Sequence, residues 1–94
     1  MRESTIEKHL RLETQKLGGK AYKWSSPGNK AVPDRICIFP NGKVYFVEMK
    51  ATGKVPSPLQ AKVIKDMRTK GHTVLVIDSK EMVNTFMTMV KEDL

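Results

Sequence analysis

The 94-residue chain has few of the residues that build disulfide frameworks, zinc sites and membrane spans. Cys37 is its one cysteine, which excludes an internal disulfide and a cysteine-rich zinc site. His9 and His72 are its two histidines, and neither has a second histidine nearby in the sequence with which to share a metal. No apolar run approaches the roughly 20 residues of a membrane span, and the charged N-terminus does not resemble a signal peptide. We therefore expect a single domain over residues 1–94 that is soluble and cytoplasmic.

Acidic residues are also scarce, because ten Asp and Glu oppose seventeen Lys and Arg and leave a formal net charge of +7. The excess lies in residues 1–72, which hold fifteen basic and six acidic side chains, whereas residues 73–94 hold two basic and four acidic ones. This asymmetry favours a polyanionic partner, which a positive face attracts over a distance and binds with release of counterions. A basic surface that only keeps the protein soluble explains the charge equally well.

Periodicity, turn residues and caps divide the chain into seven expected elements. In order they are a helix (4–17), a short strand (21–24), two longer strands (34–39 and 43–50), a helix (58–70), a buried strand (73–77) and a helix (79–91). The strand at 73–77 follows a helix, which favours parallel pairing with a neighbour. The order αβββαβα therefore predicts an α/β fold on a mixed β-sheet flanked by helices.

The turn between the two longer strands determines how they pair. Pro40 suits the first position of a type I turn, and Gly42 suits the left-handed position that follows it in a three-residue loop. In that register Asp34 lies directly opposite Glu48, and Lys50 stands on the same face. A two-residue Asn-Gly turn would instead put Asp34 on the opposite face.

Two carboxylates that stand side by side repel each other unless they share a proton or a cation. Asp34 and Glu48 would bind a hard divalent ion such as Mg²⁺ through their oxygens. The simpler interpretation is an ion pair of Lys50 with one of the two acids at the edge of the sheet.

Three short motifs in order resemble the PD-(D/E)XK nuclease signature: Val32-Pro33-Asp34-Arg35, Glu48-Met49-Lys50 and Ser57-Pro58-Leu59-Gln60. More narrowly, they resemble the VRR-NUC family in its stand-alone form from phages and bacteria, over Glu3 to about Asp78. The resemblance implies a restriction-endonuclease-like αβββαβ core, here with a further C-terminal helix. The chain departs from the family pattern at Ala31, where a glycine is usual, and the change restricts the backbone of that loop.

The resemblance implies a Mg²⁺- or Mn²⁺-dependent DNA endonuclease. Asp34 and Glu48 match the family's metal-binding acids, and the backbone carbonyl of Met49 would complete the protein ligands. Lys50 matches the lysine that orients the attacking water and supports charge on the phosphate. Phosphodiester hydrolysis builds negative charge on oxygen, which a divalent cation and a lysine both stabilise.

Two further site residues follow from the resemblance, and each has a structural alternative. Gln60 matches a helix glutamine that reaches back to the site. Glu7 best matches the first-helix glutamate, with Glu3 as the second choice. Ser4 with Glu7, and Ser57 with Gln60, also have the spacing of capping boxes, in which the side chain satisfies a backbone N–H at the helix start.

DNA contacts are expected from the polar loop after the first strand and from residues around it: Lys20, Lys23, Ser26, Lys30, Arg35 and Lys54. The basic residues of the helix at 58–70 are further candidates, although their spacing is also that of a solvated helix face. Trp24 is interpreted either as a core residue or as a side chain that stacks on an exposed base.

The last helix has an apolar arc wider than one core-facing stripe: Met82, Val83, Phe86, Met87, Met89 and Val90. A wide core contact in a monomer explains it, but the surplus also suits packing against a second copy. With the resemblance to small Holliday junction resolvases, this predicts a homodimer that cuts branched DNA in a bacterial or phage-infected cell. The alternatives are a nucleic-acid-binding module without activity and a nuclease subunit that needs a partner.

Overall fold

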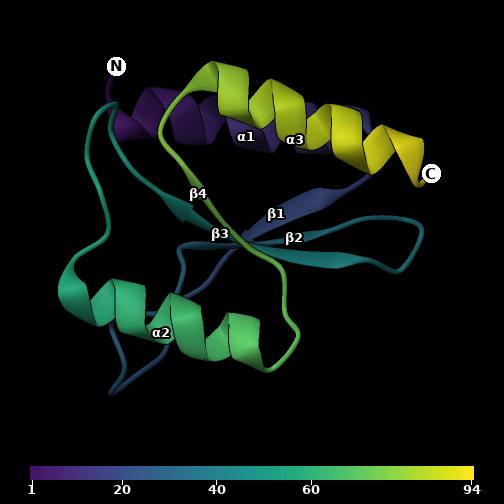
Figure 1. Ribbon diagram of the computed structural model, residues 1–94. Helices are drawn as coiled ribbons and strands as arrows, with labels where there is room; N and C mark the ends of the chain where they lie inside the picture. The colour runs from purple at the N-terminus through teal and green to yellow at the C-terminus, as the bar shows by residue number, and fades with distance from the viewer.

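The computed structural model describes residues 1–94, and its seven elements follow the predicted order (Figure 1). They are α1 (Glu3–Lys16), β1 (Lys20–Lys23), β2 (Arg35–Ile38), β3 (Val44–Met49), α2 (Pro58–Thr69), β4 (Val74–Ile77) and α3 (Lys80–Glu92). None of the three helices is long and apolar enough to cross a membrane.

The four strands form one mixed sheet in the order β1-β2-β3-β4. The first three pair antiparallel, and β4 pairs parallel with β3, as expected for a strand that follows a helix. Helices α1 and α3 lie side by side on one face of the sheet, and α2 lies on the other (Figure 1). The predicted α/β architecture is confirmed.

The hairpin of β2 and β3 has the register that its turn predicts. The Phe39 N–H donates to the Lys43 carbonyl at 3.1 Å, and the Gly42 N–H donates to the Phe39 carbonyl at 3.0 Å. Gly42 takes a φ of +82°, the left-handed conformation of a three-residue loop. Along the strands Arg35 pairs with Val47, so the next facing positions are those of Asp34 and Glu48. The two-residue turn is thereby excluded.

The start of α1 differs from one of the two predicted alternatives. The helix begins at Glu3 with Arg2 at the N-cap position, and no side chain caps it. Ser4 therefore lies inside the helix, and the capping box that its spacing with Glu7 suggested is wrong. By contrast, Ser57 and Gln60 form the expected capping box at the start of α2.

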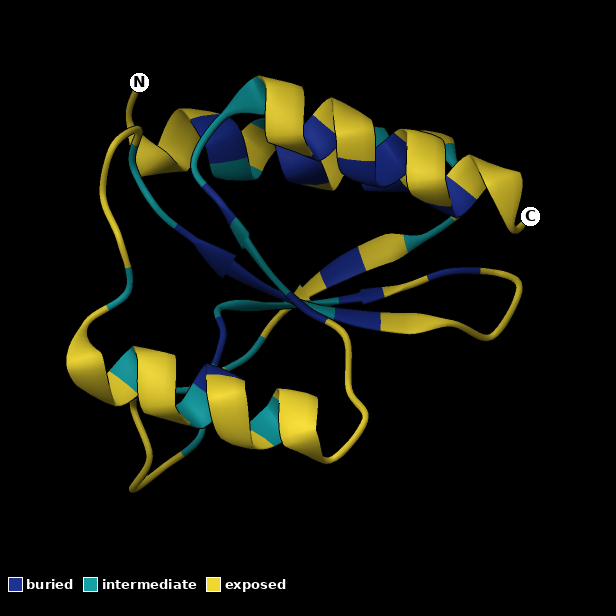
Figure 2. Cartoon of the chain, in the orientation of Figure 1, coloured by how far each residue is buried: buried dark blue, intermediate teal, exposed yellow.

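The hydrophobic core lies between the sheet and the two helices α1 and α3 (Figure 2). Alternate residues of the hairpin point into it: Cys37, Tyr45, Val47 and Met49. Burial raises the pKa of the Cys37 thiol to about 12, so this cysteine is a core residue and not a nucleophile. Most of the apolar arc of α3 is also buried here, whereas Met82 and Met89 remain partly exposed.

The opposite face of the sheet is covered less completely. Helix α2 buries only Ile64 and appears largely exposed in Figure 2. The hairpin extends past α2, and the side chains of Ile38 and Val44 on this face are each 42% exposed. One apolar half of the sheet is therefore open to solvent, on the same side as Asp34 and Glu48.

A hydrogen-bonded turn connects β3 to α2 and holds the start of α2 near the end of the strand. Asp78, just after β4, accepts from the Gly53 N–H at 3.1 Å through Oδ2 and from Thr52 Oγ1 at 2.9 Å through its backbone carbonyl. This ties the segment between Lys50 and Ser57 to the sheet, so the N-terminus of α2 is positioned beside the carboxylate pair.

Candidate active site

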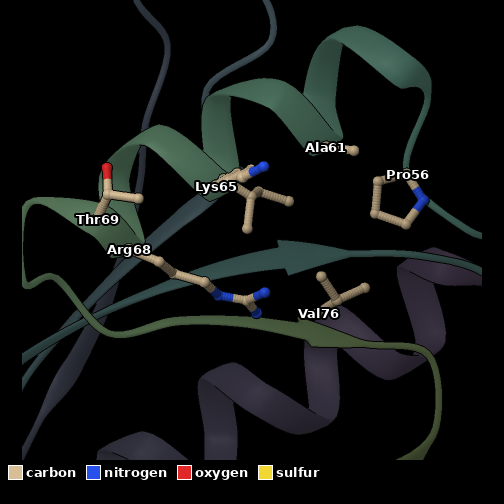
Figure 3. A pocket seen from close by; sticks show the side chains of 7 residues that line it. Pro56, Ala61, Lys65, Arg68, Thr69 and Val76 are labelled. Atoms are coloured by element: carbon tan, nitrogen blue, oxygen red, sulfur yellow. The ribbon is translucent and has the colours of Figure 1, made fainter.

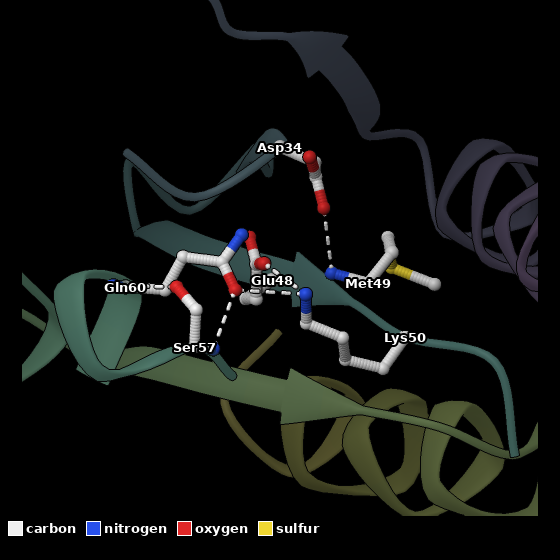
Figure 4. Close-up of polar contacts among 6 residues, drawn as sticks. All are labelled: Asp34, Glu48, Met49, Lys50, Ser57 and Gln60. Carbon is white, nitrogen blue, oxygen red and sulfur yellow. Dashed lines mark hydrogen bonds and ion pairs between the residues drawn. The ribbon is translucent and has the colours of Figure 1, made fainter. Parts of the chain in front are cut away.

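Two acidic side chains meet where β2 begins and β3 ends (Figure 4). The Asp34 carbonyl accepts from the Trp24 N–H at 2.8 Å, which fixes the backbone of Asp34 to the end of β1. Its carboxylate accepts from the Met49 N–H at 2.9 Å through Oδ2, reaching across to β3. The register places the Glu48 carboxyl beside it, so the sheet itself brings the two acids together.

Glu48 is the most unusual residue of the pair, because it is only 1% exposed. Oε2 lies 3.1 Å from Lys50 Nζ, but Oε1 is buried and has no hydrogen-bond partner. The pKa of Glu48 is raised to about 7, first by burial of the carboxyl and then by the charge of Asp34, against the lowering effect of Lys50. A buried polar oxygen without a partner costs free energy and needs an explanation.

The donor atoms around Glu48 fit a hard divalent cation. Asp34 and Glu48 supply carboxylate oxygens, and the backbone carbonyl of Met49 lies between Glu48 and Lys50 in the chain. Such oxygens are the ligands that Mg²⁺ prefers, and a bound cation would satisfy the unpartnered Oε1. The chain has no group of three or more His, Cys, Asp and Glu side chains placed to hold a metal. A cation here would therefore take its remaining ligands from the backbone and from water.

Lys50 is held between the carboxylate pair and helix α2. Its Nζ lies 3.1 Å from Glu48 Oε2 and donates to Gln60 Oε1 at 2.8 Å. The same Gln60 oxygen accepts from the Ser57 N–H at 2.9 Å, which is one half of the capping box. Gln60 thus caps α2 and contacts the site lysine at once, so the two interpretations of this residue are compatible (Figure 4).

Glu7 forms an ion pair with Arg35 and makes no hydrogen bond to Asp34 or Glu48. The Arg35 Nε donates to Glu7 Oε2 at 2.9 Å, and its Nη1 donates to the Ala21 carbonyl at 3.1 Å. Both side chains are mostly buried, so this pair joins α1 to the sheet. The contact of Arg35 with DNA stays a prediction. Its guanidinium already donates to two protein partners.

Glu3, the second choice for the first-helix acid, is exposed and interacts electrostatically with Asp34 and Lys50. Its pKa is raised above the usual value by partial burial and then by the charge of Asp34. Lys50 and Lys23 act in the opposite direction on the same carboxyl. Glu3 therefore belongs to the electrostatic environment of Asp34 and Lys50.

The other predicted residues lie around the site or away from it. Lys23, Lys30 and Lys54 are exposed, and Ser26 is half-buried, so all four remain candidates for DNA contacts. The two histidines have other partners: His9 Nε2 lies 2.8 Å from Asn84 Oδ1, an α1–α3 contact, and the His72 ring lies 5.8 Å from that of Phe46 between centroids.

A separate pocket of about 360 Å³ lies between α2 and β4 (Figure 3). It contains no acidic side chain and shares no residue with the site of Figure 4. The Arg68 guanidinium donates to the Val74 carbonyl at 3.1 Å from Nε and 2.6 Å from Nη2. This pocket holds no second set of catalytic groups.

Comparisons with known proteins point to one family. The chain is 49% identical over 82 residues to "Putative nuclease p44" of Acyrthosiphon pisum secondary endosymbiont phage 1, covering 87% of this chain and 88% of that protein. It also superposes on a solved VRR_NUC domain with a TM-score of 0.86 and 30% sequence identity, covering 92% of this chain and 94% of that one. No family model matches the chain.

The raised pKa of Glu48 predicts how stability changes with pH in the metal-free protein. Because the folded-state pKa of about 7 exceeds the usual 4.5, Glu48 holds its proton more tightly when folded. Its contribution to stability is present below about pH 4.5 and is lost as the pH rises through about 7. At pH 8 in EDTA, Glu48→Gln should therefore raise the free energy of unfolding by about 1–3 kcal/mol.

Urea denaturation of both proteins at several pH values measures this effect. The gain from Glu48→Gln should shrink towards low pH, and the exposed matched control Glu81→Gln should show no such trend. A gain that is the same at pH 5 and pH 8 would contradict the assignment.

Proposed function

The chain belongs to the VRR-NUC family of nucleases, and we propose that it is a divalent-metal-dependent DNA endonuclease whose site is Asp34, Glu48 and Lys50. The observation that carries the proposal is the buried Glu48, whose Oε1 has no hydrogen-bond partner and whose neighbour is a second acid. A protein that only bound nucleic acid would gain nothing from two close acids beside a phosphate.

The protein groups divide the work of phosphodiester hydrolysis. Asp34 and Glu48, with the Met49 carbonyl, would hold Mg²⁺ or Mn²⁺, which when bound supplies positive charge at the phosphate and a more acidic water. Lys50 donates from Nζ to the attacking water or to a phosphoryl oxygen, which stabilises the charge that develops there. Gln60 fixes the position of that ammonium group from α2.

Glu7 and Glu3 are proposed to support the site from α1 in different ways. Glu7 holds Arg35, and through it the start of β2, immediately after Asp34. Glu3 adds negative charge near Asp34 and Lys50, which favours a cation at the site. Glu7 is thus assigned a positioning role, and Glu3 is assigned an electrostatic one.

The substrate is proposed to be branched DNA. The net charge of +7 and the exposed Lys23, Lys30 and Lys54 suit a polyanion. On α3, the exposed Met82 and Met89 line an apolar groove of about 320 Å³ with β4, whose outer edge is unpaired. A second copy packed there would give a homodimer with two sites, one for each of two strands of a Holliday junction.

Cleavage of a labelled four-way junction and of a matched linear duplex tests the function. Wild-type protein should make paired cuts in the junction with Mg²⁺ or Mn²⁺ and none in EDTA. Glu48→Gln should lower the cleavage rate by at least about 100-fold, because a metal ligand is lost, while DNA binding stays equal or tightens as a negative charge disappears. Sedimentation of the same samples gives the oligomeric state.

Two different results would contradict the proposed nuclease function. Binding without cuts in any metal would favour a module without activity or a subunit that needs a partner. Loss of both binding and folding in Glu48→Gln would mean that Glu48 is structural, and Glu92→Gln, an exposed residue outside the groove, serves as the matched control.

The double role of Gln60 predicts that two cap variants will differ in activity. Gln60→Ala and Ser57→Ala each remove part of the capping box and should each cost about 0.5–2 kcal/mol of stability. Ser57→Ala keeps the Ser57 N–H and Gln60 Oε1 that hold Lys50, so its cleavage rate should stay near wild type. Gln60→Ala should cut about 10- to 100-fold more slowly.

Thermal melting and single-turnover cleavage, measured on the same preparations, separate the two effects. Equal losses of rate in both variants would show that Gln60 acts only as a cap.

A further inference from the structure

The sheet face that carries Asp34 and Glu48 continues into a row of apolar side chains, three of them exposed and two half-buried. We call this the open sheet face; it consists of Tyr22, Ile36, Ile38, Val44 and Phe46. The register places all five on the same side as the two acids, because Ile36 and Phe46 lie two residues from Asp34 and Glu48 along their strands.

The rest of the chain covers this face only in part: Ile36 and Phe46 are half-buried, whereas the other three residues are exposed. Tyr22 is 47% exposed, and Ile38 and Val44 are 42% exposed, although all three lie on strands of the sheet. Helix α2 packs towards β4, so the half of the sheet formed by β1 and β2 remains uncovered (Figure 1). A contiguous exposed apolar patch on a soluble protein commonly marks a site that binds a partner or a ligand.

The open sheet face combines aromatic rings with positive charge. Lys20 Nζ lies 4.8 Å from the centre of the Tyr22 ring, and both side chains are exposed. At its other end, Trp24 lies 5.5 Å from Phe46 between ring centroids, next to Asp34 in the hydrogen-bonded sheet. None of the five residues of the face is acidic. An aromatic surface bordered by a lysine matches a nucleobase with its phosphate.

We propose that the open sheet face holds unstacked bases of the DNA strand being cut, with Tyr22 as the main stacking residue and Lys20 on an adjacent phosphate. The inference rests on the proposed nuclease function. Side chains two residues apart on one face of a β-strand are about 6.7 Å apart. A DNA strand with its scissile phosphate at Asp34 and Glu48 would therefore place its next bases over Phe46, Ile36 and Tyr22.

A second copy fits this face less well than DNA does. A symmetric contact through this face would bring the lysine borders of the two copies together. A base stacked on Tyr22 has also left its duplex, so the face selects DNA whose strands are already separated near the cut. Junctions and frayed ends have such strands, whereas intact linear duplex does not.

Binding in EDTA tests the proposal without cleavage. The probes are a fluorescent oligothymidylate and an abasic oligonucleotide with the same number of phosphates. Tyr22→Ala should weaken the oligothymidylate by about 5- to 100-fold and leave the abasic probe unchanged, while Tyr22→Phe keeps the wild-type affinity. Trp24 is the only tryptophan, so its fluorescence should fall with the oligothymidylate alone.

Two further variants separate stacking from charge. Lys20→Ala should weaken both probes and reduce the salt dependence by about 0.7 in the logarithmic slope, as expected for one phosphate contact on a single strand. Leu12→Ala, an exposed apolar residue on α1, is the matched control and should change neither probe.

The proposal is overturned if Tyr22→Ala weakens both probes equally or neither. It is also overturned if the variant alters only sedimentation, because a second copy would then cover the face. Failure of the nuclease proposal looks different. Stacking on Tyr22 with no cleavage in any metal would refute the nuclease and leave the stacking surface. Junction cleavage by the wild type, together with unchanged oligonucleotide binding by Tyr22→Ala, would refute the stacking surface and leave the nuclease.

Discussion

The pairing of β2 with β3 is the constraint on which the rest of the site depends. The turn at residues 40–42 places Asp34 beside Glu48, and a shift of one residue would send one of the acids to the other face of the sheet. Cys37 and Val47 in the same strands are held in the core, so the register is fixed by apolar packing on the face away from the acids. The buried position of Glu48 therefore follows from the strand register, which the core packing of Cys37 and Val47 fixes.

The site also shares atoms with the elements that stabilise the fold. One oxygen of Gln60 caps α2 and accepts from Lys50, and Asp78 ties the preceding turn to the end of β4. Movement of α2 would therefore move the lysine. The open sheet face follows from the same arrangement, because a helix that is anchored beside Lys50 and packs on β4 cannot also cover β1. On this account, the position of α2 determines both the placement of Lys50 and the opening of the sheet face to unstacked DNA.

Local patterns were enough to predict the order of elements, the hairpin register and the carboxylate pair. These depend on caps, turn residues and a two-residue side-chain period, all of which act over a few positions. The pairing of Glu7 with Arg35 was missed because it joins residues 28 positions apart, through the way α1 crosses the sheet. The capping box at Ser4 failed because the N-cap is two residues earlier, at Arg2, and the helix starts at Glu3. Exposure of Tyr22 likewise depends on where α2 packs, for which the sequence has no local signal.

Calorimetric titration of Mn²⁺ into the protein near pH 6.5 is the most direct test of the central claim, that Asp34 and Glu48 form one cation site. The account predicts one binding event that Asp34→Asn and Glu48→Gln each abolish. It also predicts a binding heat that depends on the buffer, because Glu48, with a pKa of about 7, must release its proton when the cation binds. Absence of binding by the wild type, or binding that survives both substitutions, would contradict it.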